Sequence, residues 1–412
     1  MSSFDVTSIR RQFAALSRVI AGQQAVYVDG PAGSQTPECV IAAIGDYLRN
    51  HNANHGGAFA TSRENDRMLA EAQQAVADLF GVTDPSTIVF GANMTTLTFA
   101  FSRSLAQTWN AGDEVIVTQL DHDANVTPWC MAAADRGVVV REVRLRPSDA
   151  TLDLVHFQQL LSPRTRLVAV GCASNATGTL NPIPQIVQMA HSVGAEVFVD
   201  AVHYAPHGLI DVPAWNCDYL IASAYKFFGP HVGIFWGRRE RLESLTAYKV
   251  RPADNHIPDR WMTGTPNYEC IAGVRAAIDY LSCLGDPAAT RRDRLQQTFS
   301  AIRSHESNLA KQFLDGVSRN PGITLYGIGD PARLHERVPT FALRIAGMTP
   351  RAVAEYLAER GVFVWHGNFY ALRLSEVYNL EPDGMVRIGL LHYNTSEEVS
   401  RLLRLLNELS KR

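Results

Sequence analysis

Two absences narrow the interpretation of this 412-residue sequence: long apolar runs and a strong excess of one charge sign. No apolar stretch approaches the roughly 20 residues that a membrane-spanning helix needs. The formal net charge is -3 and no basic run stands out, which argues against a nucleic-acid-binding surface. The segment Met1 to Arg11 lacks the apolar core of a signal peptide. We therefore expect a cytoplasmic protein without membrane or nucleic-acid partners.

Cysteine is sparse, and its spacing fits neither a disulfide framework nor a metal site. No CxxC pair and no metal-ligand spacing occurs, so we expect free thiols in a reducing compartment and no bound metal. None follows Cys283. The six cysteines are Cys39, Cys130, Cys172, Cys217, Cys270 and Cys283.

The hydrophobic content of 46% is enough for a large buried core, and more than one core is expected. From about residue 26 to 240, short runs rich in Val and Ile alternate with longer amphipathic stretches. This alternation predicts an α/β domain with a mostly parallel sheet that is covered by helices on both faces. The predicted strands are Thr87–Phe90, Glu114–Thr118, Val138–Val143, Leu167–Gly171, Val197–Asp200, Tyr219–Ala222 and Gly233–Trp236, and the predicted helices between them include Arg67–Leu79, Thr95–Ala106 and Pro184–His191.

After about residue 265 the pattern changes to long helices followed by isolated strands, which predicts a smaller α+β domain. We expect a large domain over residues 20–264 and a small domain over 265–412, with residues 1–19 packing on the small one. The predicted elements of the small domain are the helices Tyr268–Leu284, Thr290–Ser318 and Ser396–Ser410 and the strands Ile323–Tyr326, Thr340–Ile345 and Val362–Trp365.

Asp200 and Lys226 follow two consecutive predicted strands. The carboxyl ends of such strands are where open α/β sheets bind ligands. Lys226 lies in an aromatic turn, where desolvation favours the neutral, nucleophilic amine. Taken alone, the aspartate could be a cap, and the lysine could extend from a buried turn to solvent. Together they match the needs of pyridoxal 5′-phosphate (PLP), a Schiff-base lysine and a carboxylate beside the pyridine nitrogen.

Two further segments could complete such a site. Asn93, Met94 and Thr95 open a helix after the strand Thr87–Phe90, where N–H and O–H groups can bind a phosphate. An ordinary N-cap would explain these residues equally well. His122 follows another predicted strand and could stack on the cofactor ring or lie in solvent.

These residues resemble the class V aminotransferase family, in particular its cysteine desulfurase-like branch of fold type I PLP-dependent enzymes. The similarity runs from Tyr27 to Thr395. The segments that carry it, in the family's order, are Asp121–Trp129 (DHDANVTPW), Ser174–Thr179 (SNATGT), Asp200–Pro206 (DAVHYAP), Ser223–Pro230 (SAYKFFGP), Gly264–Asn267 (GTPN) and Arg387–Thr395 (RIGLLHYNT).

The resemblance implies a role for each matching position. Lys226, Asp200 and His122 match the Schiff-base lysine, the partner of the pyridine nitrogen and the stacking histidine. The other matches are Asn175 near the ring and substrate, Thr95 and Ser223 as phosphate ligands, Thr265 as a residue reaching the partner subunit's cofactor in a homodimer, and Arg387 as the clamp for the substrate carboxylate, a task that suits a bidentate guanidinium.

Three departures from the family pattern stand out. His203 replaces a Gln beside the ring hydroxyl, and Tyr225 replaces a His before the lysine. The third lies in the loop Val364–Leu372, where desulfurases carry the cysteine that accepts sulfur and this chain carries Tyr370. Persulfide chemistry at that loop is therefore not available.

The leading hypothesis is a PLP-dependent C–S lyase that cleaves a cysteine-like amino acid by β-elimination, because that reaction needs no acceptor thiol. An aminotransferase or an amino-acid epimerase would use the same residues, with Lys226 moving the proton. The loop residues His366 and Tyr370 are expected to contact the substrate. A non-catalytic binding protein with the same fold is a third alternative, although loss of Lys226 or Asp200 would be its usual mark.

Overall fold

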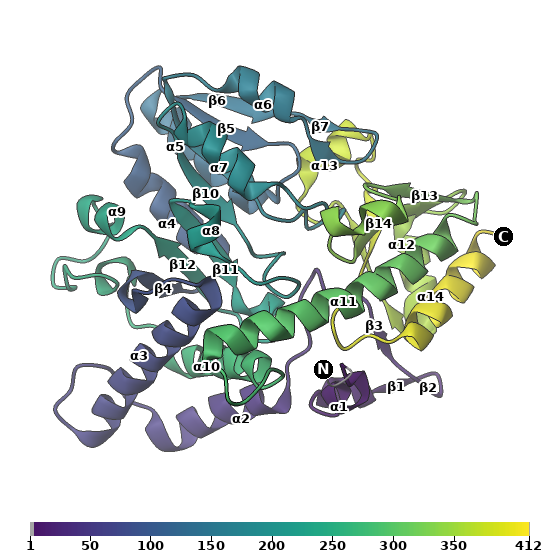
Figure 1. Cartoon of the computed structure of the whole chain (residues 1–412), viewed down its shortest axis with the longest axis horizontal. Helices are drawn as coiled ribbons and strands as arrows, with labels where there is room; N and C mark the ends of the chain where they lie inside the picture. The colour runs from purple at the N-terminus through teal and green to yellow at the C-terminus, as the bar shows by residue number, and fades with distance from the viewer. Residues whose placement is uncertain (1–3, 412) are drawn as a thin grey trace.

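The computed structural model describes residues 4–411, and its centre is a seven-stranded sheet (Figure 1). The spatial order is β4-β12-β11-β10-β9-β5-β6. Neighbours from β11 to β6 are parallel, whereas β12 runs antiparallel to both β11 and β4. The strands are β4 (Ile88–Gly91), β5 (Glu114–Thr118), β6 (Val139–Val143), β9 (Thr165–Gly171), β10 (Glu196–Asp200), β11 (Tyr219–Ser223) and β12 (Gly233–Gly237).

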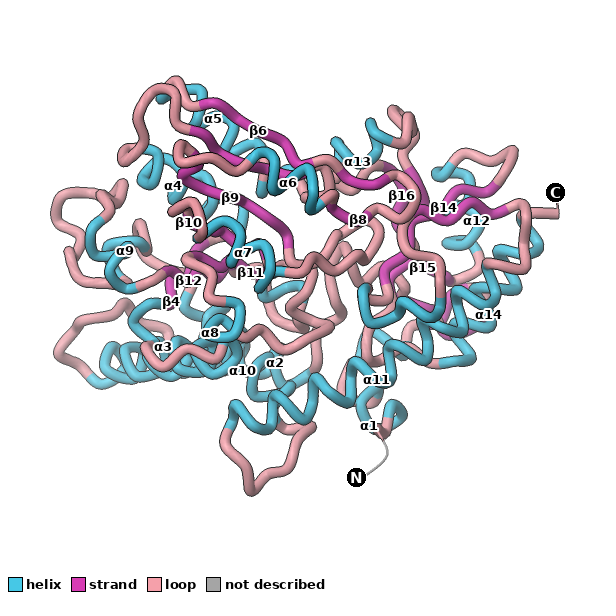
Figure 2. The backbone as a smooth tube through the Cα atoms, turned by 45° about the horizontal axis from the view of Figure 1, so that its top comes forward, coloured by secondary structure: helices cyan, strands magenta, loops and turns pink. Residues whose placement is uncertain are grey.

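Helices lie on both faces of this sheet (Figures 1 and 2). Strands β5, β11 and β12 are buried throughout, as a sheet covered on both faces requires. On one face, Phe198 of β10 packs against Phe101 and Trp129 from two of the helices. The helices around the sheet are α2 (Glu38–Asp46), α3 (Ala60–Phe80), α4 (Met94–Ala106), α5 (Thr127–Arg136), α6 (Leu154–Leu160), α7 (Ile183–His191), α8 (Val212–Trp215), α9 (Arg239–Ser244) and α10 (Tyr268–Ser282).

A second, four-stranded sheet has the order β13-β14-β17-β16 and is antiparallel throughout. Its strands are β13 (Ile323–Tyr326), β14 (Thr340–Ile345), β17 (Met385–Gly389) and β16 (Trp365–Gly367). The nearby helices are α11 (Arg291–Val317), α12 (Pro350–Glu359), α13 (Leu372–Val377) and α14 (Ser396–Leu409). Short pairs complete the strands: β1 (Val19–Ile20) with β2 (Gln23–Gln24), β3 (Val26–Tyr27) with β15 (Val362–Phe363), and β7 (Leu145–Arg146) with β8 (Thr151–Leu152); α1 (Val6–Arg10) precedes them.

The long helix α11 contributes to two separate hydrophobic cores. Leu295, Phe299 and Ile302 belong to the core around the large sheet. About three to four turns beyond Ile302, Phe313 and Val317 belong to the core of the four-stranded sheet. Figure 1 shows this helix running across the molecule from α10 to the C-terminal part. The helix therefore joins the two cores as one continuous element.

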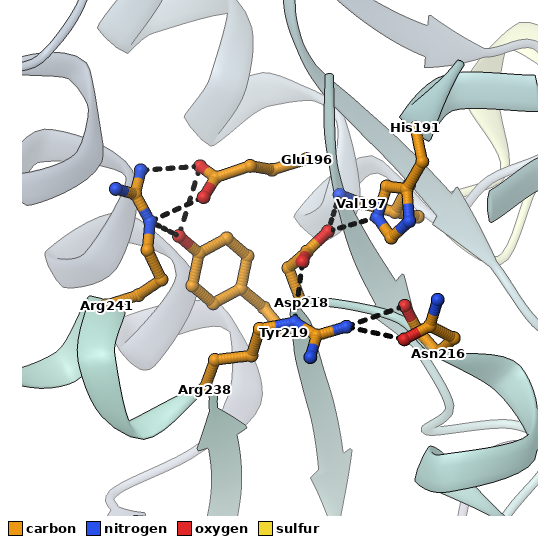
Figure 3. Close-up of polar contacts among 8 residues, drawn as sticks. All are labelled: His191, Glu196, Val197, Asn216, Asp218, Tyr219, Arg238 and Arg241. Carbon is orange, nitrogen blue, oxygen red and sulfur yellow. Dashed lines mark hydrogen bonds and ion pairs between the residues drawn. The ribbon is translucent and has the colours of Figure 1, made fainter. Parts of the chain in front are cut away.

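The N-terminal ends of β10 and β11 are tied together by a polar network (Figure 3). One carboxylate oxygen of Asp218 accepts a hydrogen bond from Val197 N at 2.8 Å and lies 2.9 Å from His191 Nε2. The other oxygen accepts from Arg238 Nε at 2.7 Å. Every oxygen of this carboxylate therefore has a protein partner at the end of the sheet opposite to Asp200.

The fold class expected from the sequence is confirmed, since an α/β unit with a mostly parallel sheet is followed by a smaller mixed unit. The segment Val362–Trp365 was expected as one strand and this is wrong. The chain crosses there between β15, which pairs with β3, and β16, which joins the four-stranded sheet. Strand β17 was not anticipated as a strand, because its apolar run continues beyond Gly389 without the alternation of a half-buried strand.

The boundaries of the two units stay a prediction. The core around the large sheet includes Ile9, Phe13 and Leu16 from the N-terminal segment, together with Ile278 of α10. The N-terminal segment also reaches the C-terminal part, because Arg10 pairs with Glu398 at 2.9 Å. Between residues 4 and 411, no helix combines the length and the apolar character that crossing a membrane requires.

Candidate active site

A cavity opens where the large-sheet strands β5, β9, β10 and β11 end. Most of the residues expected to bind the cofactor meet there, although they come from distant parts of the sequence. The lining residues are Asn93, Met94, Thr95, Asp121, His122, Gly171, Ala173, Asn175, Asp200, Val202, His203, Ser223, Tyr225 and Lys226. The resemblance therefore selected residues that the fold brings together, although their individual roles stay predictions.

Lys226 lies at the end of a short helical turn that follows β11, and its side chain is buried. Its Nζ donates to Pro31 O and, at 3.2 Å, to Ala32 O. Nζ also lies 4.8 Å from the ring centroid of Tyr225. Burial, assisted by the positive charge of Arg387, lowers the pKa of Lys226 to about 7. A substantial fraction of this amine is therefore neutral and nucleophilic near neutral pH.

Asp200 ends β10, and one of its oxygens accepts a hydrogen bond from Val202 N at 2.9 Å. Burial raises the pKa of Asp200 to about 6, and the hydrogen bond and Lys226 oppose that shift. Its second oxygen makes no hydrogen bond within the described chain. A cationic N–H donor placed in the cavity would therefore both satisfy this carboxylate and stabilise its charged form.

His122 lines the cavity, and its ring stacks on Tyr370 with centroids 5.3 Å apart and an interplanar angle of 26°. Its Nδ1 accepts a hydrogen bond from Ala124 N at 3.0 Å. Burial lowers the pKa of His122 to about 4, so the ring is neutral at pH 7. The bond from Ala124 N fixes this neutral imidazole, which places a flat aromatic ring at the cavity wall.

The proposed phosphate end of the cavity lies where α4 begins. The side chain of Asn93 accepts a hydrogen bond from Thr96 N at 2.8 Å and caps the helix, as the simpler interpretation expected. Thr95, in the first turn of this helix, lines the cavity together with Ser223. Capping does not exclude anion binding, because other N–H groups of the first turn have no partner within the helix.

Arg387, on β17, lies behind the cavity wall rather than in it. Its guanidinium donates to Asn175 O at 3.0 Å and sits 4.4 Å above the ring centroid of Phe369. Asn175 Nδ2 in turn donates to Phe369 O at 2.8 Å. Burial lowers the pKa of Arg387 to about 9, which leaves it charged at neutral pH. In this arrangement the aromatic ring of the loop covers the expected carboxylate clamp.

The remaining expected residues divide between the cavity and other places. His203 and Tyr225 line the cavity. Tyr370 is 72% exposed, and its ring stacks on His122 of the cavity wall. His366 is exposed on β16, and Thr265 lies in a separate pocket near the start of α10. Within one chain, Thr265 and His366 are therefore not part of the cavity wall.

Two acids near the cavity, one buried and one partly buried, were missed by the sequence interpretation. Asp121 lines the cavity and accepts hydrogen bonds from Gly171 N at 2.7 Å and from Asn125 at 3.2 Å. Asp29 follows β3, and one of its oxygens is buried without a partner. Burial raises the pKa of Asp29 to about 6, while Arg387 and Lys226 oppose the shift. An aspartate next to a Gly-Pro turn was the available signal, but such residues are common in ordinary turns.

The cavity fits PLP by the chemistry of its donors and acceptors. Buried polar atoms without partners gather around it, namely Asp29 Oδ1, Asn175 Oδ1 and Arg387 Nε. Native proteins rarely leave such atoms unpaired, so three of them beside one cavity, out of nine in residues 4–411, point to a polar ligand there. Lysine, carboxylate and flat imidazole are the groups that a pyridine aldehyde needs. Among residues 4–411, no cluster of three His, Cys, Asp or Glu side chains could hold a metal.

Comparison with known proteins identifies the family. The model of the class-V aminotransferases matches residues 26–402. A cysteine desulfurase of Klebsiella pneumoniae is 32% identical over an alignment of 428 positions that covers 99% of each chain. The solved cysteine desulfurase CsdA of Escherichia coli is 25% identical with a TM-score of 0.85, and the match covers 100% of this chain and 99% of that one. A cysteine desulfurase of Thermococcus onnurineus has a TM-score of 0.87 over 98% of both chains, and its 24% identity supports the fold alone. The chain belongs to the class-V aminotransferase family of PLP-dependent enzymes and is related to the cysteine desulfurases.

Proposed function

We propose that this chain is a PLP-dependent C–S lyase that cleaves a cysteine-like amino acid by β-elimination. The observation that carries the proposal is Tyr370, which occupies the loop where the resemblance places the sulfur-accepting cysteine. This loop is packed against the site, because Tyr370 O accepts a hydrogen bond from Asp123 N at 2.7 Å. The loop therefore offers the substrate an aromatic ring and a hydroxyl rather than a thiolate.

No cysteine is among the residues that line the cavity. Cys172 is the cysteine closest in sequence to the cavity wall, and burial raises its pKa well above the ordinary value. Cys217 is also buried, with a pKa raised to about 12. Both are therefore protonated at neutral pH and poor nucleophiles. The absence of an ionised thiol at the site favours elimination over sulfur transfer to the protein.

The proposed roles of the residues follow from their positions. PLP, when bound, supplies an electron sink for the bonds of the substrate's α-carbon. Arg387 binds the substrate carboxylate once the Phe369 ring moves aside, and Asn175 orients it. Lys226 Nζ, with its lowered pKa, takes the α-proton. Asp200 holds a proton at the ring nitrogen through its free oxygen. With cysteine, the C–S bond breaks, sulfur leaves as sulfide, and water converts the remaining carbon skeleton to pyruvate and ammonia.

Product analysis tests this proposal directly. The purified enzyme is incubated with cysteine, cysteine sulfinate and S-substituted cysteines, and the products are separated by chromatography. We expect pyruvate and ammonia in equal amounts. Stoichiometric alanine with a labelled protein persulfide would restore the desulfurase assignment. A keto acid from another amino acid, with none from these substrates, would support the aminotransferase alternative, and racemised substrate alone the epimerase alternative.

A non-catalytic role has its own test. Lys226 is one of four lysines in the chain, so borohydride reduction and peptide mapping can identify the one that carries the cofactor. We expect the label on Lys226. Absence of any labelled lysine in protein purified with PLP would favour a binding protein of the same fold.

We also propose a homodimer in which Thr265 reaches the partner subunit's cofactor. The support is the position of Thr265, which is exposed in a pocket beside α10 and away from its own cavity. Subunits carrying Thr265→Ala are mixed with subunits carrying Lys226→Ala. If Thr265 acts across the interface, the mixed dimer has one site free of both changes and regains activity. A monomer in sedimentation at micromolar concentration would contradict this proposal.

A further inference from the structure

Behind His203 lies a buried pair of titratable groups that the proposed reaction does not use. His207 Nδ1 lies 2.8 Å from Glu306 Oε2, and the side chains of both residues are at most 3% exposed. The ring of His207 is also T-shaped to the ring of His203, with centroids 5.5 Å apart. The pair thus directly contacts a residue of the cavity wall.

His203 itself is held at one nitrogen only. Its Nε2 lies 3.0 Å from Thr340 Oγ1, while Nδ1 has no hydrogen-bond partner in the described chain and belongs to a residue lining the cavity. The resemblance places this position beside the ring hydroxyl of the cofactor. Whether Nδ1 donates or accepts there depends on the tautomer and charge of His203.

Glu306 occupies an unusual place on α11. It lies between the part of the helix that enters the large core, ending at Ile302, and the part that begins at Leu309 in the second core. Its Oε1 is buried without a hydrogen-bond partner. A carboxylate retained only for stability would have hydrogen bonds to both oxygens, because a buried oxygen without a partner destabilises the fold. Its retained contact is the imidazole of His207.

We propose that His207 and Glu306 are positioning residues that set the charge and tautomer of His203, and through it the protonation of the cofactor's ring oxygen. The proposal rests on the cofactor assigned in the proposed function but not on the identity of the substrate. An ionised Glu306 places a negative charge beside His207 and behind His203, and that charge stabilises a proton on neighbouring groups. An uncharged side chain at this position gives no such stabilisation.

The groups around His203 oppose its protonation. Burial lowers the pKa of His203 well below its ordinary value, and the imidazole, ammonium and guanidinium groups that face it lower it further. Burial raises the pKa of Glu306, and its cationic neighbours oppose that shift. The facing groups are His207, Lys226, Arg387 and His122 for His203, and His207 and Arg303 for Glu306; Arg337 lines the same small pocket as the pair.

The test is the pH titration of the visible absorption of the bound cofactor, measured without substrate. Glu306→Gln keeps the shape of the side chain and removes its ability to carry charge. We expect the midpoint to fall by about 0.5–1 pH unit, because the protonated form loses a stabilising negative charge. Glu306→Asp, which keeps the charge, should lie closer to the wild type. Asp218→Asn removes a carboxylate from another His–carboxylate pair far from the cavity, and should leave the midpoint unchanged (Figure 3).

A double-mutant cycle separates a positioning role from a structural one. In a His203→Gln background, Glu306→Gln should no longer move the midpoint, because the proposed effect passes through His203. A shift of the same size in both backgrounds would overturn the proposal, as would no shift in either. If Glu306→Gln does not fold, Glu306→Asp should move the midpoint by a smaller amount in the wild-type background, through the altered distance to His207, and not at all in the His203→Gln background.

Failure of the proposed function gives a different pattern. A chain that binds the cofactor but transaminates would leave these titrations unaffected. A chain that takes up no cofactor would contradict the proposed function, and the inference is then tested by imidazole nitrogen chemical shifts in labelled histidine. Glu306→Gln should change the nitrogen shifts of His203 in that protein. Unchanged His203 shifts would overturn the inference regardless of cofactor.

Discussion

The polar groups at the two ends of strands β10 and β11 differ in how many of their atoms have hydrogen-bond partners in the protein. At the N-terminal ends, Asp218 has a partner for each oxygen, and no residue drawn in Figure 3 is among the buried unpartnered groups of residues 4–411. At the C-terminal ends, Asp200 has a free oxygen, and Asn175 and Arg387 have unpartnered atoms nearby. The same strands therefore end in a self-sufficient network on one side and an incomplete one on the other. Incomplete satisfaction marks the end of the sheet where a ligand is expected.

The largest expected effect comes from removing Lys226, which follows the C-terminal end of β11, where polar groups lack partners. Lys226→Ala should abolish the visible cofactor band and lower kcat/KM by more than about 10³-fold, because the variant has no amine at that place. Lys249→Ala is the matched control, since this lysine bonds to the backbone of its own loop. Retention of the cofactor band in Lys226→Ala would show that another lysine binds it.

The next largest effect concerns the clamp. Arg387→Lys keeps a positive charge but loses the planar fork that reaches a carboxylate. We expect kcat/KM to fall by about 10- to 100-fold, since a hydrogen bond to a charged group contributes roughly 1.5–3 kcal/mol. Arg344→Lys, on the neighbouring strand β14, tests whether any arginine of this sheet has the same effect. Equal losses in both variants would remove Arg387 from the substrate site.

The pH dependence of cofactor uptake tests whether Lys226, at the ligand-binding end of the sheet, differs from an ordinary solvated lysine. Burial lowers the pKa of Lys226 to about 7, so the reactive neutral amine increases as pH rises through 7 instead of near 10.5. The uptake rate of cofactor-free protein should therefore rise about tenfold per unit below pH 7 and level off above about pH 8. Stopped-flow absorbance measures this rate. A rate still rising between pH 9 and pH 10 would show an ordinary, solvated lysine.

At the N-terminal ends of β10 and β11, where the polar network is complete, we expect a substitution to change stability and not catalysis. Asp218→Asn removes the charge that His191 and Arg238 share and weakens the bond from Val197 N. We expect the free energy of unfolding to fall by about 1–3 kcal/mol, with an unchanged cofactor spectrum. Urea unfolding of the holoenzyme measures the first quantity. A change in kcat at constant cofactor occupancy would contradict the division between the two ends.

The smallest effect is expected for Tyr370→Phe. The ring that stacks on His122 is retained, and the tyrosine hydroxyl has no hydrogen-bond partner in the described chain. If the ring of Tyr370 acts by packing in the loop, kcat stays within about twofold of the wild type, whereas Tyr370→Ala should lower kcat/KM several-fold by releasing the loop. A tenfold loss of kcat in Tyr370→Phe alone would instead assign proton donation to its hydroxyl.

Much of the fold could be predicted from local patterns of apolar residues in the sequence. The boundaries of β5, β13 and β14 agree with the runs of apolar residues, because these strands are bounded by turns. The split between β15 and β16 was not accessible, because one continuous run serves two sheets and only tertiary pairing decides where it divides. Strand β17 was missed for a similar reason, as its apolar run has no period-two alternation.

The site was less accessible than the fold. Lys226 and Asp200 could be paired because consecutive parallel strands end at the same edge of a sheet. The contact of Phe369 with Arg387 joins a loop and a strand through tertiary packing, and local sequence contains no sign of it. Asp29 and Glu306 stand out because each has a buried carboxylate oxygen without a hydrogen-bond partner. This property exists only in the folded chain and cannot be read from the sequence.

Helix α11 has a mechanical consequence for the whole molecule. Its 27 residues span about 40 Å as a single rod, with each half anchored in a different hydrophobic core. Melting of either core removes the support from half of this helix, and a helix of some 13 residues is only marginally stable alone. The two cores should consequently lose structure in one cooperative transition, and amide protons on both halves of α11 should exchange with solvent at the same, global rate.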